Sequence, residues 1–151
     1  MKIKKSSCAD TRTCDWSKVS EEQLKEQSLQ HIEDVRLGFQ FIIEKLQRAA
    51  LFHDTTKISH IHEFWGDFRT GFKNQLWWEM HQKEERHHFN KPEFVPKDIN
   101  LIDVIEQIID GVMAGMARSG TWRKEPISNE LLQSAYENTA KLLLDNLEVI
   151  E

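Results

Sequence analysis

The scarcity of glycine and proline constrains this chain more than any other feature of its sequence. There are 6 glycines and 3 prolines among 151 residues, and no proline interrupts a long apolar pattern. A β-sandwich or β-barrel needs a turn signal about every ten residues, and this chain does not supply them. We therefore expect an all-α protein, a single compact domain of five to six helices. Its length suffices for one hydrophobic core without disulfides.

The charge balance and the cysteines exclude several classes of protein. With 25 Asp and Glu against 20 Lys and Arg, the net charge is −5, so neither long nucleic acids nor anionic membranes are expected partners. No apolar run approaches the roughly 18 residues of a membrane span, and none follows the basic start MKIKK, as a secretory signal requires. Cys8 and Cys14 fit neither a disulfide framework nor a zinc motif. These features predict a cytoplasmic protein with reduced thiols.

Local signals divide the chain into an arm and a helical domain. Residues 1–19 show no periodicity and are expected to form a loosely ordered N-terminal arm, and residues 20–151 form the domain. Ser20 and Gln23 match a capping box at the start of the first helix. The other expected boundaries are a break near Gly66 or Gly71, an N-cap at Asp98 or Asn100, a helix end near Gly120 and an N-cap at Ser128 or Asn129.

The candidate chemistry centres on His53-Asp54, at the end of an apolar helical run. Adjacent side chains on a helix point about 100° apart, so this pair could bind one ion only together with ligands from other helices. His31 lies on the apolar stripe of an earlier helix. Asp110 lies inside a later helix, among small residues that leave space for a ligand. The alternative is a helix end at which His53 favours the dipole and Asp54 is merely solvated, with Asp103, Glu106 and Asp110 as a solvated acidic edge.

Further histidines and aromatic residues follow the His53-Asp54 pair. His81 and His88 are seven residues apart and share one face of a continuous helix, with His87 beside them; the alternative is a polar, exposed helix end. We expect His60 and His62 to lie on the surface or to support other ligands. Six aromatic residues are expected to be mostly core, with a nucleobase-stacking wall as the alternative: Phe64, Trp65, Phe68, Phe72, Trp77 and Trp78.

These residues resemble those of the HD-domain superfamily of metal-dependent phosphohydrolases. The order His31, His53-Asp54, Asp110 and the HDTTK form of the motif carry the resemblance. More specifically, the chain is similar to a small HD-like family found in bacteriophages and bacteria, through the blocks HIEDV, RAALFHDTTK, HQKEERHH and INLIDVIEQIIDGVMAGMARSG. Many HD nucleotidases have an acid shortly after the pair. Lys57 stands there instead, so their acid-assisted mechanism is not carried over.

The resemblance implies that His31, His53, Asp54 and Asp110 bind one divalent ion. Two imidazoles and two carboxylates form a mixed site that suits Mn, Fe, Co, Ni or Zn. One ion is expected, and a second would involve the later histidines. His81, His87 or His88 would either hold that second ion or protonate the leaving group, and the sequence leaves this choice open.

The residues expected to contact the substrate carry positive charge or an aromatic ring. Asp54, Lys57 and Arg118 are the candidate catalytic residues, because the two cations could stabilise charge on phosphoryl oxygens. Trp122, beside Arg123 and Lys124, is a further candidate for contact with the substrate.

One geometric requirement accompanies this ligand set. His31 and His53 are 53 − 31 = 22 residues apart, or about 33 Å on one straight helix. A shared ion therefore requires a turn, which we place in residues 41–47, with antiparallel helices on either side. If the helix continues instead, His81 or His87 has to replace His31.

The function expected from these features is hydrolysis of a small phosphorylated substrate, with a nucleotide favoured. A di-iron oxygenase that uses His81 and His87 as additional ligands is the alternative enzyme. An HD-like helical interaction protein without catalysis is the third reading. A homodimer through the apolar C-terminal segment LLLDNLEVI is also compatible with the sequence.

Overall fold

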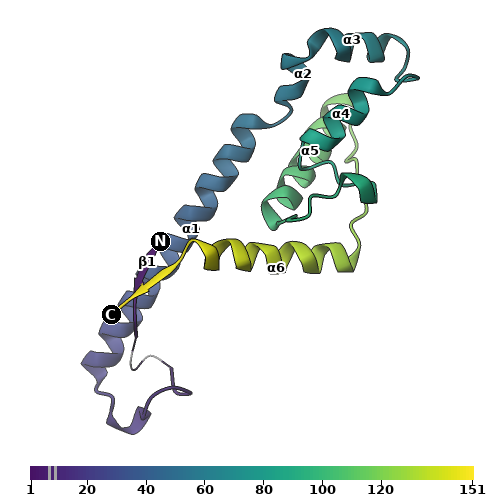
Figure 1. Cartoon of the computed structure of the whole chain (residues 1–151). Coiled ribbons are helices and arrows are strands. Elements are labelled where there is room, and N and C mark those ends of the chain that lie inside the picture. Colours follow the sequence, from purple (N-terminus) through teal and green to yellow (C-terminus); the bar gives the residue numbers. More distant parts are fainter. Residues whose placement is uncertain (7, 9) are drawn as a thin grey trace. The chain divides into compact units, whose positions relative to one another are not determined.

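The computed structural model describes residues 1–6, 8 and 10–151. Its elements are β1 (Lys2–Lys4), the 3-10 helix η1 (Trp16–Lys18), α1 (Glu21–Phe52), α2 (Thr55–Ser59), α3 (Ile61–Arg69), α4 (Leu76–Glu84), the 3-10 helix η2 (Pro92–Phe94), α5 (Leu101–Ser119), α6 (Asn129–Asp145) and β2 (Glu148–Ile150) (Figure 1). The prediction of an all-α protein is confirmed. Within the described residues, none of the helices combines the length and apolarity needed to cross a bilayer.

The chain divides into two compact units. Unit 1 comprises residues 1–44 and 141–151, and unit 2 comprises residues 45–140. In unit 1, β1 pairs in parallel with β2, with Ile3 opposite Val149. The Gln30 side chain of α1 donates a hydrogen bond of 2.7 Å to the Lys4 carbonyl oxygen. The segment expected to be a loosely ordered arm therefore contains a strand paired with the C-terminal strand.

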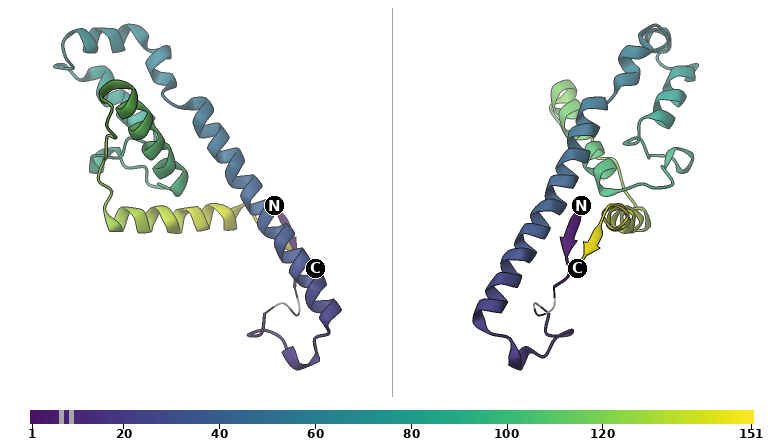
Figure 2. Two further views of the ribbon diagram at one scale, coloured as in Figure 1. Left: turned by 180° about the vertical axis from the view of Figure 1, so that it is seen from behind. Right: turned by 60° about the vertical axis from the view of Figure 1, so that its left-hand side comes forward.

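Helix α1 begins as predicted but does not turn back. Ser20 Oγ accepts a hydrogen bond from the Gln23 N–H at 3.2 Å, and Gln23 Oε1 accepts one from the Ser20 N–H at 3.0 Å. The helix then runs unbroken to Phe52 (Figure 2), so the predicted turn in residues 41–47 is wrong. The segment FQFIIEKLQ contains no glycine, proline or capping residue. Nothing local therefore competes with continuation of the helix.

The start of α5 is fixed to the loop that precedes it. Arg86 donates to both carboxylate oxygens of Asp103 at 2.8 Å and to Asp98 Oδ1 at 2.9 Å. Asp103 Oδ2 also accepts from the Asn100 N–H, so Asn100 is the N-cap of the two predicted candidates and forms a capping box with Asp103. Beside these contacts lies the apolar core of unit 2, formed by Phe89, Ile99, Val104 and Ala135. The Arg86 contacts hold the residues that directly follow it, including His87, against α5.

The connection from α3 to α4 is fixed by a buried carboxylate. The break falls at Gly71, which has a positive φ of 66°, whereas Gly66 lies inside α3. Asp67 Oδ2 accepts hydrogen bonds from the backbone N–H groups of Trp77 and Trp78 at 2.8 and 3.2 Å. A carboxylate at a helix N-terminus satisfies free N–H groups and favours the helix dipole. Asp67 thereby sets the position of α4, which carries His81.

The small residues of α5 make room for the chain itself. A Cβ at Gly111 would lie 2.6 Å from the Arg123 carbonyl oxygen, and one at Gly115 would lie 2.3 Å from the Thr121 carbonyl oxygen. The Arg123 N–H also donates to the Gly111 carbonyl oxygen at 3.2 Å. Residues 121–123 therefore fill the space on this face of α5. This corrects the expectation that the small residues near Asp110 leave that space for a ligand.

This packing predicts different outcomes for two glycine-to-alanine substitutions. Gly115→Ala should lower the free energy of unfolding by about 1–3 kcal/mol, because its methyl group overlaps backbone atoms. Gly66→Ala places its methyl group where no atom lies within 4 Å apart from its chain neighbours and the nearby backbone of α3, and should raise stability by up to about 1 kcal/mol. Urea unfolding followed by circular dichroism measures both. Equal effects of the two substitutions would contradict the packing of residues 121–123 on α5.

Candidate metal centre

The site is built around a sharp reversal of the backbone after α1. That helix ends at Phe52, and Asp54 adopts the left-handed conformation (φ 55°, ψ 21°) just before α2. Aspartate tolerates this conformation better than most residues. His53 and Asp54 thus lie on a tight turn rather than on one helix. His53 Nε2 lies 3.4 Å from Asp54 Oδ2.

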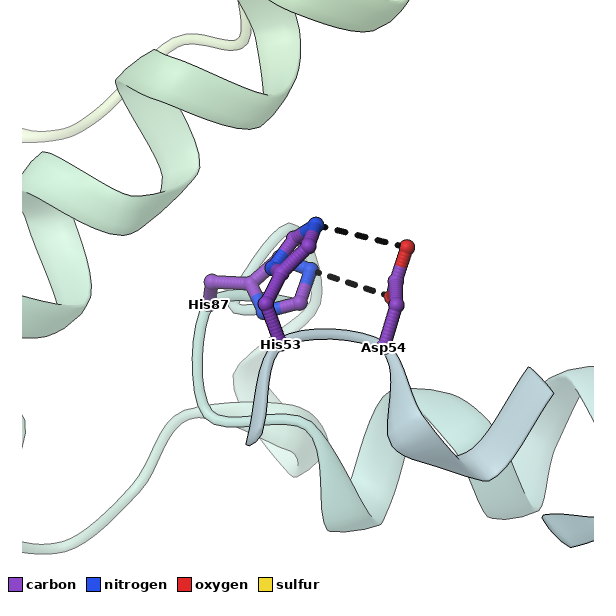
Figure 3. Close-up of side chains that lie close together, drawn as sticks. All are labelled: His53, Asp54 and His87. Carbon is purple, nitrogen blue, oxygen red and sulfur yellow. Dashed lines mark ion pairs between the residues drawn. The ribbon is translucent and has the colours of Figure 1, made fainter. Parts of the chain in front are cut away.

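Imidazole rings flank both oxygens of the Asp54 carboxylate. His81 Nε2 lies 3.4 Å and His87 Nε2 lies 3.6 Å from Asp54 Oδ1. Figure 3 shows the rings of His53 and His87 together on one side of Asp54, with their ion pairs to it. His88 Nε2 lies 2.9 Å from His81 Nε2. The residues form two overlapping groups of potential ligands that share Asp54, namely His53, Asp54 and His87, and Asp54, His81 and His88.

Several polar atoms of this cluster are buried without a hydrogen bond. His81 is 0% and His87 1% exposed. Among the described residues, Asp54 Oδ1 and both ring nitrogens of His87 have no partner of good hydrogen-bond geometry, although His87 Nδ1 lies 3.1 Å from Glu106 Oε1. Buried polar atoms without partners are costly and uncommon. A cation between Asp54 Oδ1 and His87 Nε2, which are 3.6 Å apart, would satisfy these two atoms.

Glu106 orients the His53 ring, and sequence reasoning missed this role. His53 Nδ1 lies 2.9 Å from Glu106 Oε1. A carboxylate only accepts hydrogen bonds, so Nδ1 carries a proton, and the lone pair of the neutral ring is on Nε2, which faces Asp54. The acidic edge considered as the alternative is wrong for Asp103, which is buried against Arg86. Glu106 lies one helical turn before Asp110 and thus on the same face of α5, which is the signal that could have identified it.

The charges of the site shift the pKa values of its members. Burial lowers the pKa of His81 to about 3 and that of His88 to about 4, with neighbouring imidazoles acting in the same direction. Burial alone would raise the pKa of Asp54, but the Lys57 ammonium lowers it below its usual value. His81 and His88 are therefore neutral near pH 7. Neutral imidazoles suit metal ligation better than proton donation.

His87 and Glu106 shift each other in the opposite sense. Burial alone would lower the pKa of His87, but its ion pair with Glu106, together with Asp54 and Asp110, raises it. Burial alone would raise the pKa of Glu106, but His87 and His53 lower it. His87 accordingly holds a proton more readily than His81 and His88 do.

The structure brings together most of the residues that the sequence singled out. Asp110 Oδ1 lies 3.7 Å from His53 Nε2, and Lys57 Nζ pairs with Asp54 Oδ2. His31 is not brought to them: it is exposed, 22 residues before His53, in a helix that is continuous to Phe52. His81 and His87 lie at Asp54 in its place.

The remaining candidates belong to α5, to the segment that follows it, and to α3 and α4. Arg118 is exposed in the last turn of α5, two turns after Asp110. Trp122 is 52% exposed, and the Lys124 ammonium lies 6.0 Å from its ring centroid. The Trp77 ring stacks between those of Phe64, at 4.1 Å, and His81, at 4.6 Å. The packing role expected for the aromatic residues thus extends to the support of His81, whereas Trp65 and Phe68 are exposed.

Comparison of the chain with protein-family models, curated proteins and solved structures finds no match. The HD-domain resemblance therefore stays a prediction from sequence motifs. The chemistry of the site is inferred from its geometry.

The donor set fits a divalent transition metal. It combines neutral imidazole nitrogens with carboxylate oxygens, the ligands of Mn, Fe, Co, Ni and Zn. His81 Nε2 and His88 Nε2 are 2.9 Å apart. Two ligand nitrogens that bind one ion at right angles, each at about 2.0–2.1 Å, would lie about 3 Å apart. The spacing of these two rings is thus compatible with a common ion.

The lowered histidine pKa values predict acid lability of the metal-free protein. Between pH 6.5 and about 4, the unfolded chain binds protons at positions 81 and 88 that the folded chain rejects. The free energy of unfolding should therefore fall as the pH falls, by on the order of 1.4 kcal/mol per pH unit and ring. The raised pKa of His87 acts above pH 6.5, where the folded chain binds that proton more readily than the unfolded chain does, so it does not oppose the slope in this range. Urea unfolding in EDTA at several pH values measures the slope.

Two histidine variants provide the controls for this pH dependence. His88→Asn should reduce the slope between pH 6.5 and 4.5 by about half, because it removes one of the two rings with a lowered pKa. His62→Asn removes an exposed ring and should leave the slope unchanged. A stability that does not change over this range in the wild type would contradict burial of neutral His81 and His88.

Proposed function

We propose that this protein is a metal-dependent phosphohydrolase that acts on a small phosphorylated substrate, with a nucleotide favoured. The observation that carries this proposal is the Asp54 carboxylate, which has imidazole Nε2 atoms within 3.4–3.6 Å on both of its oxygens. The order of His53-Asp54 and Asp110 in the sequence, which resembles HD-domain hydrolases, supports it.

The residues expected to hold the ion are His53, Asp54 and Asp110, with His81, His87 and His88 in the role first assigned to His31. When bound, a divalent ion supplies a Lewis acid that polarises a phosphoryl oxygen and acidifies water near neutral pH. In the neutral His53 ring, the Glu106 carboxylate places the single proton on Nδ1 and leaves the lone pair on Nε2 for a ligand role. Each of these side chains belongs to unit 2.

Two cations support a phosphorylated substrate over other classes. Lys57 Nζ pairs with Asp54 and its side chain is 26% exposed, so the ammonium lies beside the metal ligands and within reach of solvent. Arg118 lies on α5 two turns after Asp110, and its guanidinium fork matches a phosphate. Both would neutralise charge on the transferred group. The exposed Trp122 ring, beside Lys124, suits a nucleobase.

A specific observation favours a second candidate function. Asp54 belongs to both potential ligand groups, so its two oxygens could bridge two ions. Two iron ions in such a site suit oxygen chemistry, and a di-iron oxygenase is the alternative that this arrangement supports. It predicts two irons per chain and consumption of O₂, whereas the hydrolase predicts phosphate release without O₂. Metal binding without either activity would favour the third reading, a non-catalytic interaction protein.

Asp54→Asn tests the proposed site most directly. Asparagine tolerates the left-handed backbone and keeps the shape of the side chain, so the change removes mainly the charge. Metal affinity should fall by more than about 100-fold, because removing a ligand costs more than disturbing its supporting residues. Release of phosphate from generic phosphoesters with Mn²⁺, Co²⁺ or Ni²⁺ should be lost, while helicity is retained.

The matched control is Asp145→Asn, because Asp145 also pairs with a lysine, at 2.6 Å from Lys141, but is exposed. This variant should keep both metal and activity. Retained phosphate release in Asp54→Asn would reject the assigned site.

Arg118→Ala tests contact with the substrate apart from metal binding. The variant should lose about 2 kcal/mol of transition-state stabilisation, or about 30-fold in kcat/KM, as expected for a charge-assisted contact. Its metal content should equal that of the wild type. Arg36→Ala, which removes an exposed arginine paired with Glu33, is the control. An unchanged kcat/KM in Arg118→Ala would remove Arg118 from the substrate site.

A further inference from the structure

Thr56 and Glu85 form a buried pair directly behind His81. Thr56 is 8% and Glu85 8% exposed. Glu85 Oε1 accepts two hydrogen bonds from Thr56, one from its backbone N–H at 3.1 Å and one from its hydroxyl at 2.7 Å. The same hydroxyl oxygen lies 2.7 Å from His81 Nδ1. The three residues therefore form a chain of short contacts that begins at a carboxylate and ends at an imidazole.

The number of available protons determines which atom donates and which accepts in each of these hydrogen bonds. A threonine hydroxyl has one proton, and a carboxylate has none to donate. Because the hydroxyl proton goes to Glu85, the hydroxyl oxygen can only accept from His81. His81 Nδ1 must then carry the proton of the neutral ring. The lone pair of the ring is left on Nε2, which lies 3.4 Å from Asp54 Oδ1 and 2.9 Å from His88 Nε2.

We propose that Thr56 and Glu85 are positioning residues that hold His81 in the Nδ1-protonated tautomer, so that His81 Nε2 is available as a metal ligand beside Asp54. The role of this pair in metal binding rests on the proposed function, whereas the tautomer itself does not. Supporting groups of this kind orient ligand histidines and typically contribute 10–100-fold to metal affinity. Neither residue contacts the substrate in this account.

The sequence offers a matched set of substitutions for the test. Thr56→Val keeps the shape of the side chain and removes the hydroxyl, and Thr56→Ser keeps the hydroxyl. Thr55→Val makes the same change at the neighbouring exposed position. Thr56→Val should weaken Co²⁺ binding about 10–100-fold, whereas Thr56→Ser and Thr55→Val should bind Co²⁺ as the wild type does. Equal Co²⁺ affinity of Thr56→Val and Thr55→Val would overturn the role of Thr56 in metal binding.

The tautomer is measured directly in the full-length, EDTA-treated wild type. Long-range ¹H–¹⁵N NMR of labelled imidazoles near pH 7 distinguishes the protonated ring nitrogen from the bare one. We expect the proton of His81 on Nδ1 in the wild type and in Thr56→Ser, and its redistribution toward Nε2 in Thr56→Val. A wild-type His81 that carries its proton on Nε2 would overturn the proposal without any variant.

The NMR measurement also distinguishes a failure of the His81 positioning from a failure of the hydrolase function. The NMR readout needs neither metal nor substrate. A wild type that shows the Nδ1-protonated tautomer but releases no phosphate would contradict the hydrolase and support the positioning of His81. A wild type that releases phosphate but carries the His81 proton on Nε2 would support the hydrolase and contradict the positioning of His81 by Thr56 and Glu85.

Discussion

The site depends on keeping the charge of one carboxylate in a largely buried position. The Asp54 side chain is 15% exposed, and burial alone would favour its protonated form. The Lys57 ammonium on one oxygen keeps it ionised. The other oxygen has no hydrogen-bond partner among the described residues and faces two imidazole Nε2 atoms. A buried carboxylate oxygen that has no hydrogen-bond partner and faces imidazole nitrogens is an arrangement that a cation stabilises.

The rest of unit 2 holds this arrangement in place through carboxylates that serve the fold. Asp67 fixes the start of α4 and so sets the position of His81. Asp103 binds Arg86 and fixes the segment that carries His87. Glu106 orients His53. Three acids thus act on three different histidines, and each acts through a hydrogen bond or ion pair rather than through apolar packing.

Features that depend on a few neighbouring residues could be predicted from the sequence. The capping box at Ser20, the N-cap at Asn100 and the glycine at position 120 each satisfy backbone groups within a few residues of themselves. The start of α6 is similar, because Ser128 Oγ accepts from the Leu131 N–H. These local rules account for the confirmed all-α class and for most helix ends.

Features that depend on distant contacts could not be predicted in the same way. The turn in residues 41–47 was needed only to bring His31 to His53, and no residue there favours it. The histidines that lie at Asp54, where His31 was expected, come from α4 and the following loop, whose position depends on Arg86 and Asp67. The roles of Glu106, Thr56 and Glu85 follow from hydrogen bonds between segments far apart in the chain. Single-sequence periodicity carries no information on such contacts.

Anomalous diffraction from crystals grown with Co²⁺, recorded on both sides of the cobalt absorption edge, tests the central claim most directly. We expect an anomalous peak within about 2.0–2.2 Å of an Asp54 carboxylate oxygen and of imidazole Nε2 atoms from at least two of its neighbouring histidines. A peak elsewhere on the chain, with Asp54 bound only to Lys57, would contradict the account.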